Sequence, residues 1–214
     1  MKIDDLSNMR QDYTVGELSE KMMQEDPLQQ FKLWMEKAIE LDIVEPNAMI
    51  IATSTAEGKP SARTVLLKEV NDKGFVFFTN YLSRKGRELT ANPFASVVFD
   101  WHAIARQIRI DGRVEKLSEV DSDDYFNLRP EASKIGAWVS PQSQVVRDRE
   151  ELESLQVKFE KLFEDNIITR PPHWGGFLIK PDVIEFWQGR SNRLHDRIVY
   201  YKTKDGWTIH RLAP

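Results

Sequence analysis

The chain has 214 residues, of which 41% are hydrophobic and 30% charged, and its formal net charge is −4 at pH 7. This composition indicates one substantial core, and the acidic balance argues against a general nucleic-acid binder, which needs a basic surface. The absence of cysteine excludes disulfides, thiolate metal sites and cysteine nucleophiles. No apolar run reaches the roughly 18 residues of a membrane span, and the N-terminus is unlike a signal peptide, so we expect a cytoplasmic protein without a membrane partner.

The N-terminal half is predicted to form a helix followed by a β-meander. Asp26 and Pro27 are typical of a helix start, and apolar residues at helical spacing continue to about Leu41. The elements predicted after this helix are strands over 48–56, 61–70 and 75–79, a short helix over 84–91, and strands over 94–101 and 104–117.

The C-terminal half is predicted to contain two helices and then four strands. The helices cover 119–129, ended by Pro130, and about 148–163; the strands cover 177–179, 183–187, 197–202 and 207–212. Hairpin-connected strands with few helices favour an antiparallel barrel, in a single domain, over a βαβ sheet. No dinucleotide or Walker motif is present, and the four histidines lack the spacing of a zinc site, so we expect no metal.

Three cations, Arg84, Lys85 and Arg87, crowd the first turn of the short predicted helix after Ser83. They face the positive end of the helix dipole, which costs a few tenths of a kcal/mol each. A bound phosphate would reverse that cost and use the free backbone N–H groups as well. We therefore favour a phosphate site here over a misplaced helix start.

Two further clusters suit anions. Arg63 and Lys68 are five residues apart, so a regular strand would direct them to opposite faces, which suits two anionic ligands or a ligand at a subunit interface. Tyr125 and Arg129 lie one helical turn apart with Ser133 just beyond, a plausible phosphate clamp. Taken singly, each of these residues is also typical of a solvated surface.

The stretch W-Q-G-R-S-N-R-L-H-D-R (187–197) is the most unusual in the chain. In a β-strand, Arg193, His195 and Arg197 would share one face, where they repel one another unless something anionic or electron-rich lies against them. Trp187 and Gly189 upstream suit a flat ligand that the backbone approaches closely. The alternative is a solvated edge strand protected from aggregation by its charges.

These segments together resemble the pyridoxine/pyridoxamine 5′-phosphate oxidase family of FMN enzymes. The resemblance is carried, in order, by R-T-V-L-L-K (63–68), F-F-T-N-Y-L-S-R-K (77–85), R-Q-I-R-I-D-G (106–112), Y-F-N-L-R-P (125–130), I-G-A-W-V-S-P-Q-S (135–143), F-W-Q-G…R-L-H-D-R (186–197) and the terminal R-L-A-P. It implies an antiparallel split β-barrel with flanking helices, forming a homodimer with FMN at the subunit interface. Residues 1–25 would be a lid, and 26–214 one domain including a C-terminal dimerisation region.

The resemblance also implies a reaction and a set of site residues. The reaction is oxidation of pyridoxine or pyridoxamine 5′-phosphate to pyridoxal 5′-phosphate, with hydride transfer to FMN and reoxidation by O₂ to hydrogen peroxide. Expected at the flavin are Arg63, Thr64, Val65, Leu66, Leu67, Lys68, Phe78, Thr79, Arg84, Lys85, Gln107, Gln142, Ser143, Trp187 and Arg197. Expected at the substrate are Arg10, Tyr13, Lys68, Tyr125, Arg129, Ser133, Arg193, Leu194 and His195.

Three of these residues are expected to be catalytic. Arg193 and His195 would orient and polarise the substrate ring, and Arg197 would stabilise the reduced flavin. Two other functions remain open: a split-barrel flavin oxidoreductase with another substrate, or a non-catalytic protein that binds FMN or pyridoxal phosphate. The phosphate clamp argues against the first and the presence of Arg193 and His195 against the second; a nucleic-acid-binding barrel is a distant third.

Overall fold

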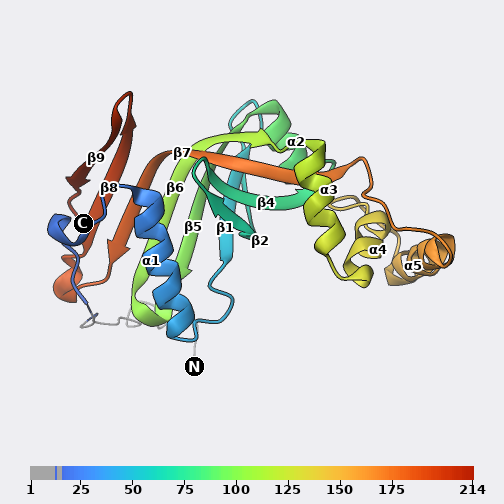
Figure 1. The fold of residues 1–214 in the computed structure, drawn as a ribbon, viewed down its shortest axis with the longest axis horizontal. Helices are drawn as coiled ribbons and strands as arrows, with labels where there is room; N and C mark the ends of the chain where they lie inside the picture. Colours follow the sequence, from blue (N-terminus) through green and yellow to red (C-terminus); the bar gives the residue numbers. More distant parts are fainter. Residues whose placement is uncertain (1–12, 14–15) are drawn as a thin grey trace, which may run out of the picture. The chain divides into compact units, whose positions relative to one another are not determined.

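The structure is a computed structural model that describes residue 13 and residues 16–214 (Figure 1). Its helices are α1 (Pro27–Glu40), α2 (Arg84–Ala91), α3 (Glu119–Leu128), α4 (Glu131–Val139) and α5 (Arg149–Phe163). Its strands are β1 (Ala48–Ser54), β2 (Pro60–Leu66), β3 (Glu69–Asn71), β4 (Gly74–Asn80), β5 (Phe94–Trp101), β6 (Arg106–Lys116), β7 (Trp174–Gln188), β8 (Asp196–Thr203) and β9 (Gly206–Arg211). None of the helices in this part of the chain is long and apolar enough to cross a membrane.

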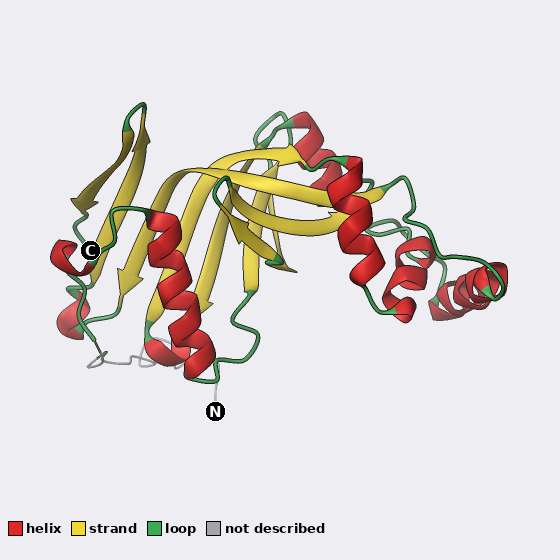
Figure 2. Ribbon diagram, viewed as in Figure 1, coloured by secondary structure: helices red, strands yellow, loops and turns green. Residues whose placement is uncertain are grey.

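The strands form one hydrogen-bonded sheet (Figure 2). Their order is β2-β1-β5-β6-β7-β4-β3, with β8 paired to β7 and β9 paired to β8. The pairs β3–β4, β4–β7, β7–β8 and β8–β9 are antiparallel, as the predicted hairpins require. The chain divides into two compact units: a first unit from within 1–49, 97–111 and 181–214, and a second from 50–96 and 112–180.

The first unit is organised by α1. The Asp26 side chain accepts a hydrogen bond from the Leu28 N–H, and Pro27 occupies the first turn, as the sequence indicates. The buried face of α1 packs edge-to-face on the strands, with Phe31 against Phe99 at 5.0 Å and Trp34 against Phe186 at 5.1 Å between ring centroids.

The second unit is organised by β4, which is buried along nearly all of its length, and by the helix that follows it. Ser83 caps α2 by accepting a hydrogen bond from the Gly86 N–H at 3.2 Å. A Cβ atom built on Gly86 would lie 2.3 Å from the Tyr81 carbonyl oxygen, so α2 contacts the backbone after β4 more closely than any other residue would allow. Local sequence thus fixes the N-terminus of α2 at the end of β4.

The single strand predicted over 61–70 is wrong, because two strands, β2 and β3, occupy this segment. β2 pairs with β1, whereas β3 pairs with β4, so the chain changes partner at Leu67 and Lys68. Leu67 is buried, and the Lys68 N–H donates to the Val76 carbonyl at 2.8 Å. The argument from strand alternation therefore does not apply to Arg63 and Lys68.

Three further expectations need correction. The strands predicted over 177–179 and 183–187 are parts of one strand, β7, which includes Pro181. Proline has no backbone N–H to donate, but Pro181 lies between the segment of β7 that pairs with β4, which ends at Ile179, and the segment that pairs with β8. Helix α4 was missed because Pro130 ends α3 and also serves as the N-cap of α4. Residues 193–195 are not in a strand: Ser191–Arg193 form a 3₁₀ turn in which Asn192 and Arg193 have φ of 55° and 61°.

Candidate active site

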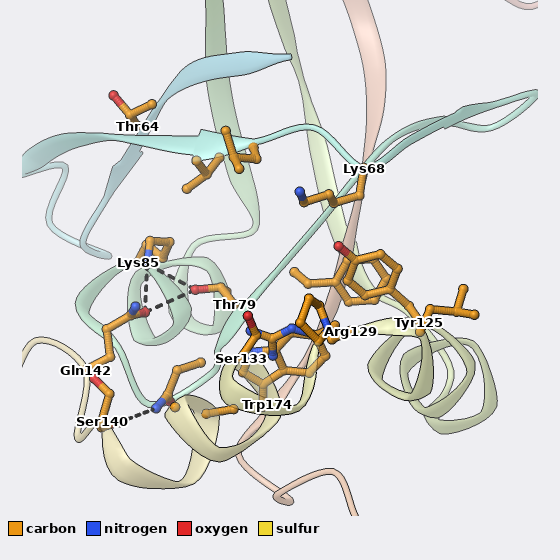
Figure 3. Close-up of a pocket in the computed structure, with 18 residues that line it drawn as sticks. Thr64, Lys68, Thr79, Lys85, Tyr125, Arg129, Ser133, Ser140, Gln142 and Trp174 are labelled. Atoms are coloured by element: carbon orange, nitrogen blue, oxygen red, sulfur yellow. Dashed lines mark hydrogen bonds between the residues drawn. The ribbon is translucent and has the colours of Figure 1, made fainter. Parts of the chain in front are cut away.

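A cavity of about 620 Å³ in the second unit brings together residues from all three predicted anion clusters (Figure 3). From the expected flavin set it is lined by Thr64, Val65, Leu66, Lys68, Phe78, Thr79, Lys85 and Gln142, and from the expected substrate set by Lys68, Tyr125, Arg129 and Ser133. Asn80, which with Thr79 offers polar groups at the end of the strand before α2, also lines it. Sequence reasoning missed the other lining residues, which are Leu128, Pro130, Gly136, Ala137, Ser140 and Trp174. Lys68, Lys85 and Arg129 are cationic and none of the lining residues is acidic, so the cavity suits anions.

Lys85 is buried at one side of this cavity, with 7% of its surface exposed. Its Nζ lies 3.0 Å from Thr79 Oγ1 and 3.0 Å from Gln142 Oε1 (Figure 3). Ser83 Oγ lies 3.4 Å away, so all three partners are uncharged acceptors. Burial, and to a lesser degree the nearby Arg63, lower the pKa of Lys85 to about 8. A buried ammonium with only neutral partners in the described chain is favourable for binding an anion.

The Arg129 side chain packs against a row of stacked aromatic rings. Its guanidinium carbon lies 4.5 Å from the ring centroid of Trp174, and Trp174 stacks on Phe78, with ring centroids 5.4 Å apart. Phe78 in turn stacks on Tyr125 at 3.8 Å, and burial raises the pKa of Tyr125, which therefore remains protonated and able to donate. The Arg129 Nη1 atom is buried without a hydrogen-bond partner among the described residues, which leaves a strong donor available.

Two other residues of the expected flavin set, Arg63 and Arg84, do not line the cavity; both pair with Glu88 on α2. The distances are 3.5 Å from Arg63 Nη2 to Glu88 Oε2 and 2.9 Å from Arg84 Nε to Glu88 Oε1. Burial acts to raise the pKa of Glu88, but hydrogen bonds from Ser61, Thr53 and Arg84 outweigh it and lower the pKa to about 2. Sequence reasoning missed Glu88, although its spacing of four residues from Arg84 was a usable signal.

The residues expected around the substrate ring lie in the first unit. Trp187 and His195 have ring centroids 4.7 Å apart, and the Tyr13 ring lies edge-on to both. His195 Nδ1 accepts a hydrogen bond from the Arg190 backbone N–H at 3.1 Å, so the neutral ring carries its proton on Nε2. A Cβ on Gly189 would lie 2.7 Å from the Tyr13 ring, so the close approach seen at this glycine is to Tyr13, and the expected approach to a flat ligand stays a prediction.

Arg197, also in the first unit, is held by a buried carboxylate. Its Nε and Nη2 donate to Glu185 at 2.7 and 3.0 Å, and this bonding raises the Arg197 pKa. Arg109 approaches the same carboxylate at 3.4 Å. This bidentate pairing fixes the plane of the Arg197 guanidinium.

The remaining expected site residues are placed as follows. Leu67 is buried in the core, Ser143 is exposed with φ of 69°, and Leu194 is 69% exposed. The Gln107 side chain donates to Asp100 at 3.3 Å. Arg10 lies outside the described residues.

Comparison with known proteins identifies the family. Residues 35–163 match the model described as pyridoxamine 5′-phosphate oxidase, and residues 174–214 match the pyridoxine 5′-phosphate oxidase C-terminal dimerisation region. A pyridoxine/pyridoxamine 5′-phosphate oxidase of Trichormus variabilis is 54% identical over 210 residues, 98% of each chain. The chain belongs to the pyridoxine/pyridoxamine 5′-phosphate oxidase family.

A second relative and a solved structure agree with this assignment. The enzyme of the same name from Rubrobacter xylanophilus is 48% identical, covering 98% of this chain and 97% of that relative. Among solved structures, PhzG from Burkholderia lata 383, in complex with tetrahydrophenazine-1-carboxylic acid, is 30% identical with a TM-score of 0.88 over 95% of this chain and 100% of that one. The predicted fold class, an antiparallel split barrel with flanking helices, is confirmed, and the matched dimerisation region supports a homodimer.

Proposed function

We propose that this chain oxidises pyridoxine 5′-phosphate or pyridoxamine 5′-phosphate to pyridoxal 5′-phosphate, with FMN as cofactor and O₂ as the final acceptor. The observation that carries the proposal is the cavity of the second unit, whose charged lining residues are Lys68, Lys85 and Arg129 with no acid among them. Relatives about half identical over nearly the whole chain bear the name of this activity.

The residues around α2 fit the phosphate of FMN. Arg63, Arg84 and Lys85 carry three positive charges against the single carboxylate of Glu88, an excess that matches a phosphate of about −2. Ser83 and the first turn of α2 add hydrogen-bond donors at the positive end of the helix dipole. Bound FMN would supply the two-electron acceptor that protein side chains lack.

The substrate phosphate is assigned to the aromatic side of the cavity. Arg129 offers the unpartnered Nη1 donor, and Lys68, Tyr125 and Ser133 line the same space. Charge-assisted hydrogen bonds from an arginine and a lysine select a phosphorylated substrate over its free alcohol. Because Trp174 and Tyr125 hold their positions by stacking, the clamp is formed before the substrate arrives.

Residues of the first unit are assigned to the reacting end of the substrate. With its proton on Nε2, His195 can donate a hydrogen bond to an oxygen or nitrogen of the substrate, and Arg193 would orient the ring beside it. Arg197, fixed by Glu185, would place positive charge where the reduced flavin becomes anionic. Tyr13 belongs to the proposed lid, residues 1–25, and the homodimer would bind FMN between its subunits.

The test is the visible spectrum of the purified protein with FMN, made anaerobic, before and after addition of pyridoxine 5′-phosphate. We expect a flavin spectrum that bleaches and then returns when air is admitted, with formation of hydrogen peroxide. A flavin spectrum that does not bleach with either phosphorylated substrate would contradict the oxidase assignment and favour a carrier or an oxidoreductase of another substrate.

A further inference from the structure

Glu88 is a buried carboxylate that lies beside the cavity without lining it, and only 5% of its surface is exposed. Burying a carboxylate without a partner costs folding free energy, so a buried glutamate requires partners that compensate for this cost. The residues that satisfy Glu88 include the two arginines expected at the FMN phosphate.

Both oxygens of Glu88 accept hydrogen bonds from three elements of the second unit. Oε2 accepts from Thr53 Oγ1 on β1 and Ser61 Oγ on β2, each at 2.5 Å, and lies 3.5 Å from Arg63 Nη2. Oε1 accepts from Arg84 Nε at 2.9 Å. Glu88 thus connects the two arginines to β1 and β2 through one carboxylate.

The two guanidiniums are used differently. Arg63 bonds through both terminal nitrogens, from Nη1 to Thr53 at 2.5 Å and from Nη2 to Ser61. Arg84 bonds to Glu88 through Nε alone, its side chain is 56% exposed, and no hydrogen bond joins its two terminal nitrogens to the described residues. An arginine held by Nε presents its terminal N–H groups as a fork that suits a phosphate.

We propose that Glu88 is a positioning residue of the cofactor site, which holds Arg63 and Arg84 so that their N–H groups, with Lys85, receive the 5′-phosphate of FMN. The inference rests on the proposed function, since it takes FMN as the ligand. Glu88 also separates two like charges that would otherwise repel each other.

Electrostatics alone predicts the opposite effect for the loss of Glu88. The substitution Glu88→Gln removes a negative charge beside the phosphate site, which by itself would strengthen phosphate binding. Positioning predicts weaker binding, because the amide cannot accept the same bonds from both arginines and two hydroxyls. The sign of the change therefore separates the two roles.

The experiment measures the dissociation constants of FMN and of riboflavin, which has the same ring and ribityl chain but no phosphate, by quenching of flavin fluorescence. For Glu88→Gln we expect FMN to bind about tenfold more weakly and riboflavin to be unchanged. Unchanged or tighter FMN binding, or an equal loss for both ligands, would overturn the inference, the last outcome because it indicates a purely structural role.

Two further variants make the result decisive. Thr53→Val keeps the shape of β1 but removes the hydroxyl shared by Glu88 and Arg63, so it should also weaken FMN selectively; a lack of selective loss there counts against the inference even if Glu88→Gln does not fold. Glu185→Gln is the matched control. Glu185 is a buried carboxylate that pairs with Arg109 and Arg197, and its substitution should leave the ratio of FMN to riboflavin affinity unchanged.

A wild-type protein that binds neither flavin would contradict the proposed function itself, whereas selective FMN binding unaffected by Glu88→Gln would contradict the inference alone.

Discussion

The guanidinium of Arg129 lies over the ring of Trp174, with 4.5 Å between Cζ and the ring centroid, and this contact takes the place of a carboxylate partner. A planar cation on an aromatic face is attracted by the ring quadrupole, and its charge is not neutralised as it would be by a carboxylate partner. Arg63, Arg84 and Arg197 are instead held by buried glutamates. Arg129 therefore keeps its full charge for a ligand.

Trp174→Leu should weaken the binding of the substrate phosphate by Arg129. Loss of a partly desolvated cation–π contact of about 1–2 kcal/mol should raise KM for pyridoxine 5′-phosphate on the order of tenfold, with a smaller change in kcat and no loss of FMN. Steady-state kinetics with the FMN-loaded variant checks this. Trp138→Leu changes a tryptophan that packs α4 on α5 and does not itself line the cavity, so it should leave KM within about twofold. Equal effects in the two variants would refute the role of Trp174.

Local sequence was sufficient for much of the fold. The N-terminal boundaries of α1 and α2 follow from the caps expected at Asp26 and Ser83, each of which accepts a hydrogen bond from a backbone N–H. Asp148 caps α5 in the same way, close to the predicted start of that helix. The continuity of strands could not be read locally. The strand predicted over 61–70 is interrupted at Leu67, where the pairing partner changes, whereas β7 continues although its partner changes from β4 to β8. Partner changes depend on tertiary pairing, which has no signal in the alternation of one strand.

The candidate site, like the fold, was predicted where the signal is local and missed where it depends on tertiary contacts. The excess of cations at the start of α2 predicted an anion site, and Lys85 lies buried there with neutral partners. Trp174 was missed because a tryptophan that begins a strand is ordinary in sequence and gains its role from Arg129, far away along the chain. The spacing of Glu88 from Arg84 was a signal, but its bond to Thr53, 35 residues away, could not be read from the sequence. The alternation of Arg193 and His195 suggested a strand face, but two residues with positive φ place them in a turn.

The pKa of Lys85 predicts a pH dependence of FMN binding. The pKa of about 8 lies below the ordinary value, so the apo protein loses this charge as pH rises through about 8, and FMN then binds only with uptake of a proton. We expect the FMN dissociation constant to be nearly constant below pH 7 and to rise by up to about tenfold per pH unit above pH 8. Fluorescence titrations between pH 6 and 9.5 measure it.

Lys85→Arg serves as the control for this pH dependence. Arginine keeps its charge over the whole range, so the variant should bind FMN with a constant that changes little between pH 7 and 9.5, whatever its absolute affinity. A rise in the dissociation constant that is the same in both proteins would assign the dependence to another group.

Arg193→Leu should lower kcat/KM for pyridoxine 5′-phosphate while FMN stays bound. Arg193 lies in the turn before β8 and has no expected contact with the flavin phosphate, so the loss should fall on substrate orientation. We expect a decrease on the order of a hundredfold, within the range for a misplaced reacting group, measured as the rate of anaerobic flavin bleaching. An unchanged rate would remove Arg193 from the reaction.

Gly86→Ala should destabilise the protein through the packing of α2. The added Cβ would lie 2.3 Å from the Tyr81 oxygen and 2.7 Å from its Cα, both backbone atoms that cannot rotate away, so α2 must shift at a cost of about 1–3 kcal/mol. Thermal or urea unfolding of the apo protein measures the loss. Gly136→Ala on α4 is the matched control, since nothing lies within 4 Å of its Cβ and alanine favours a helix, so this variant should be as stable as wild type or more so by up to about 1 kcal/mol. Equal stability of the two variants would show that α2 is not held against Tyr81 as closely as the structure describes.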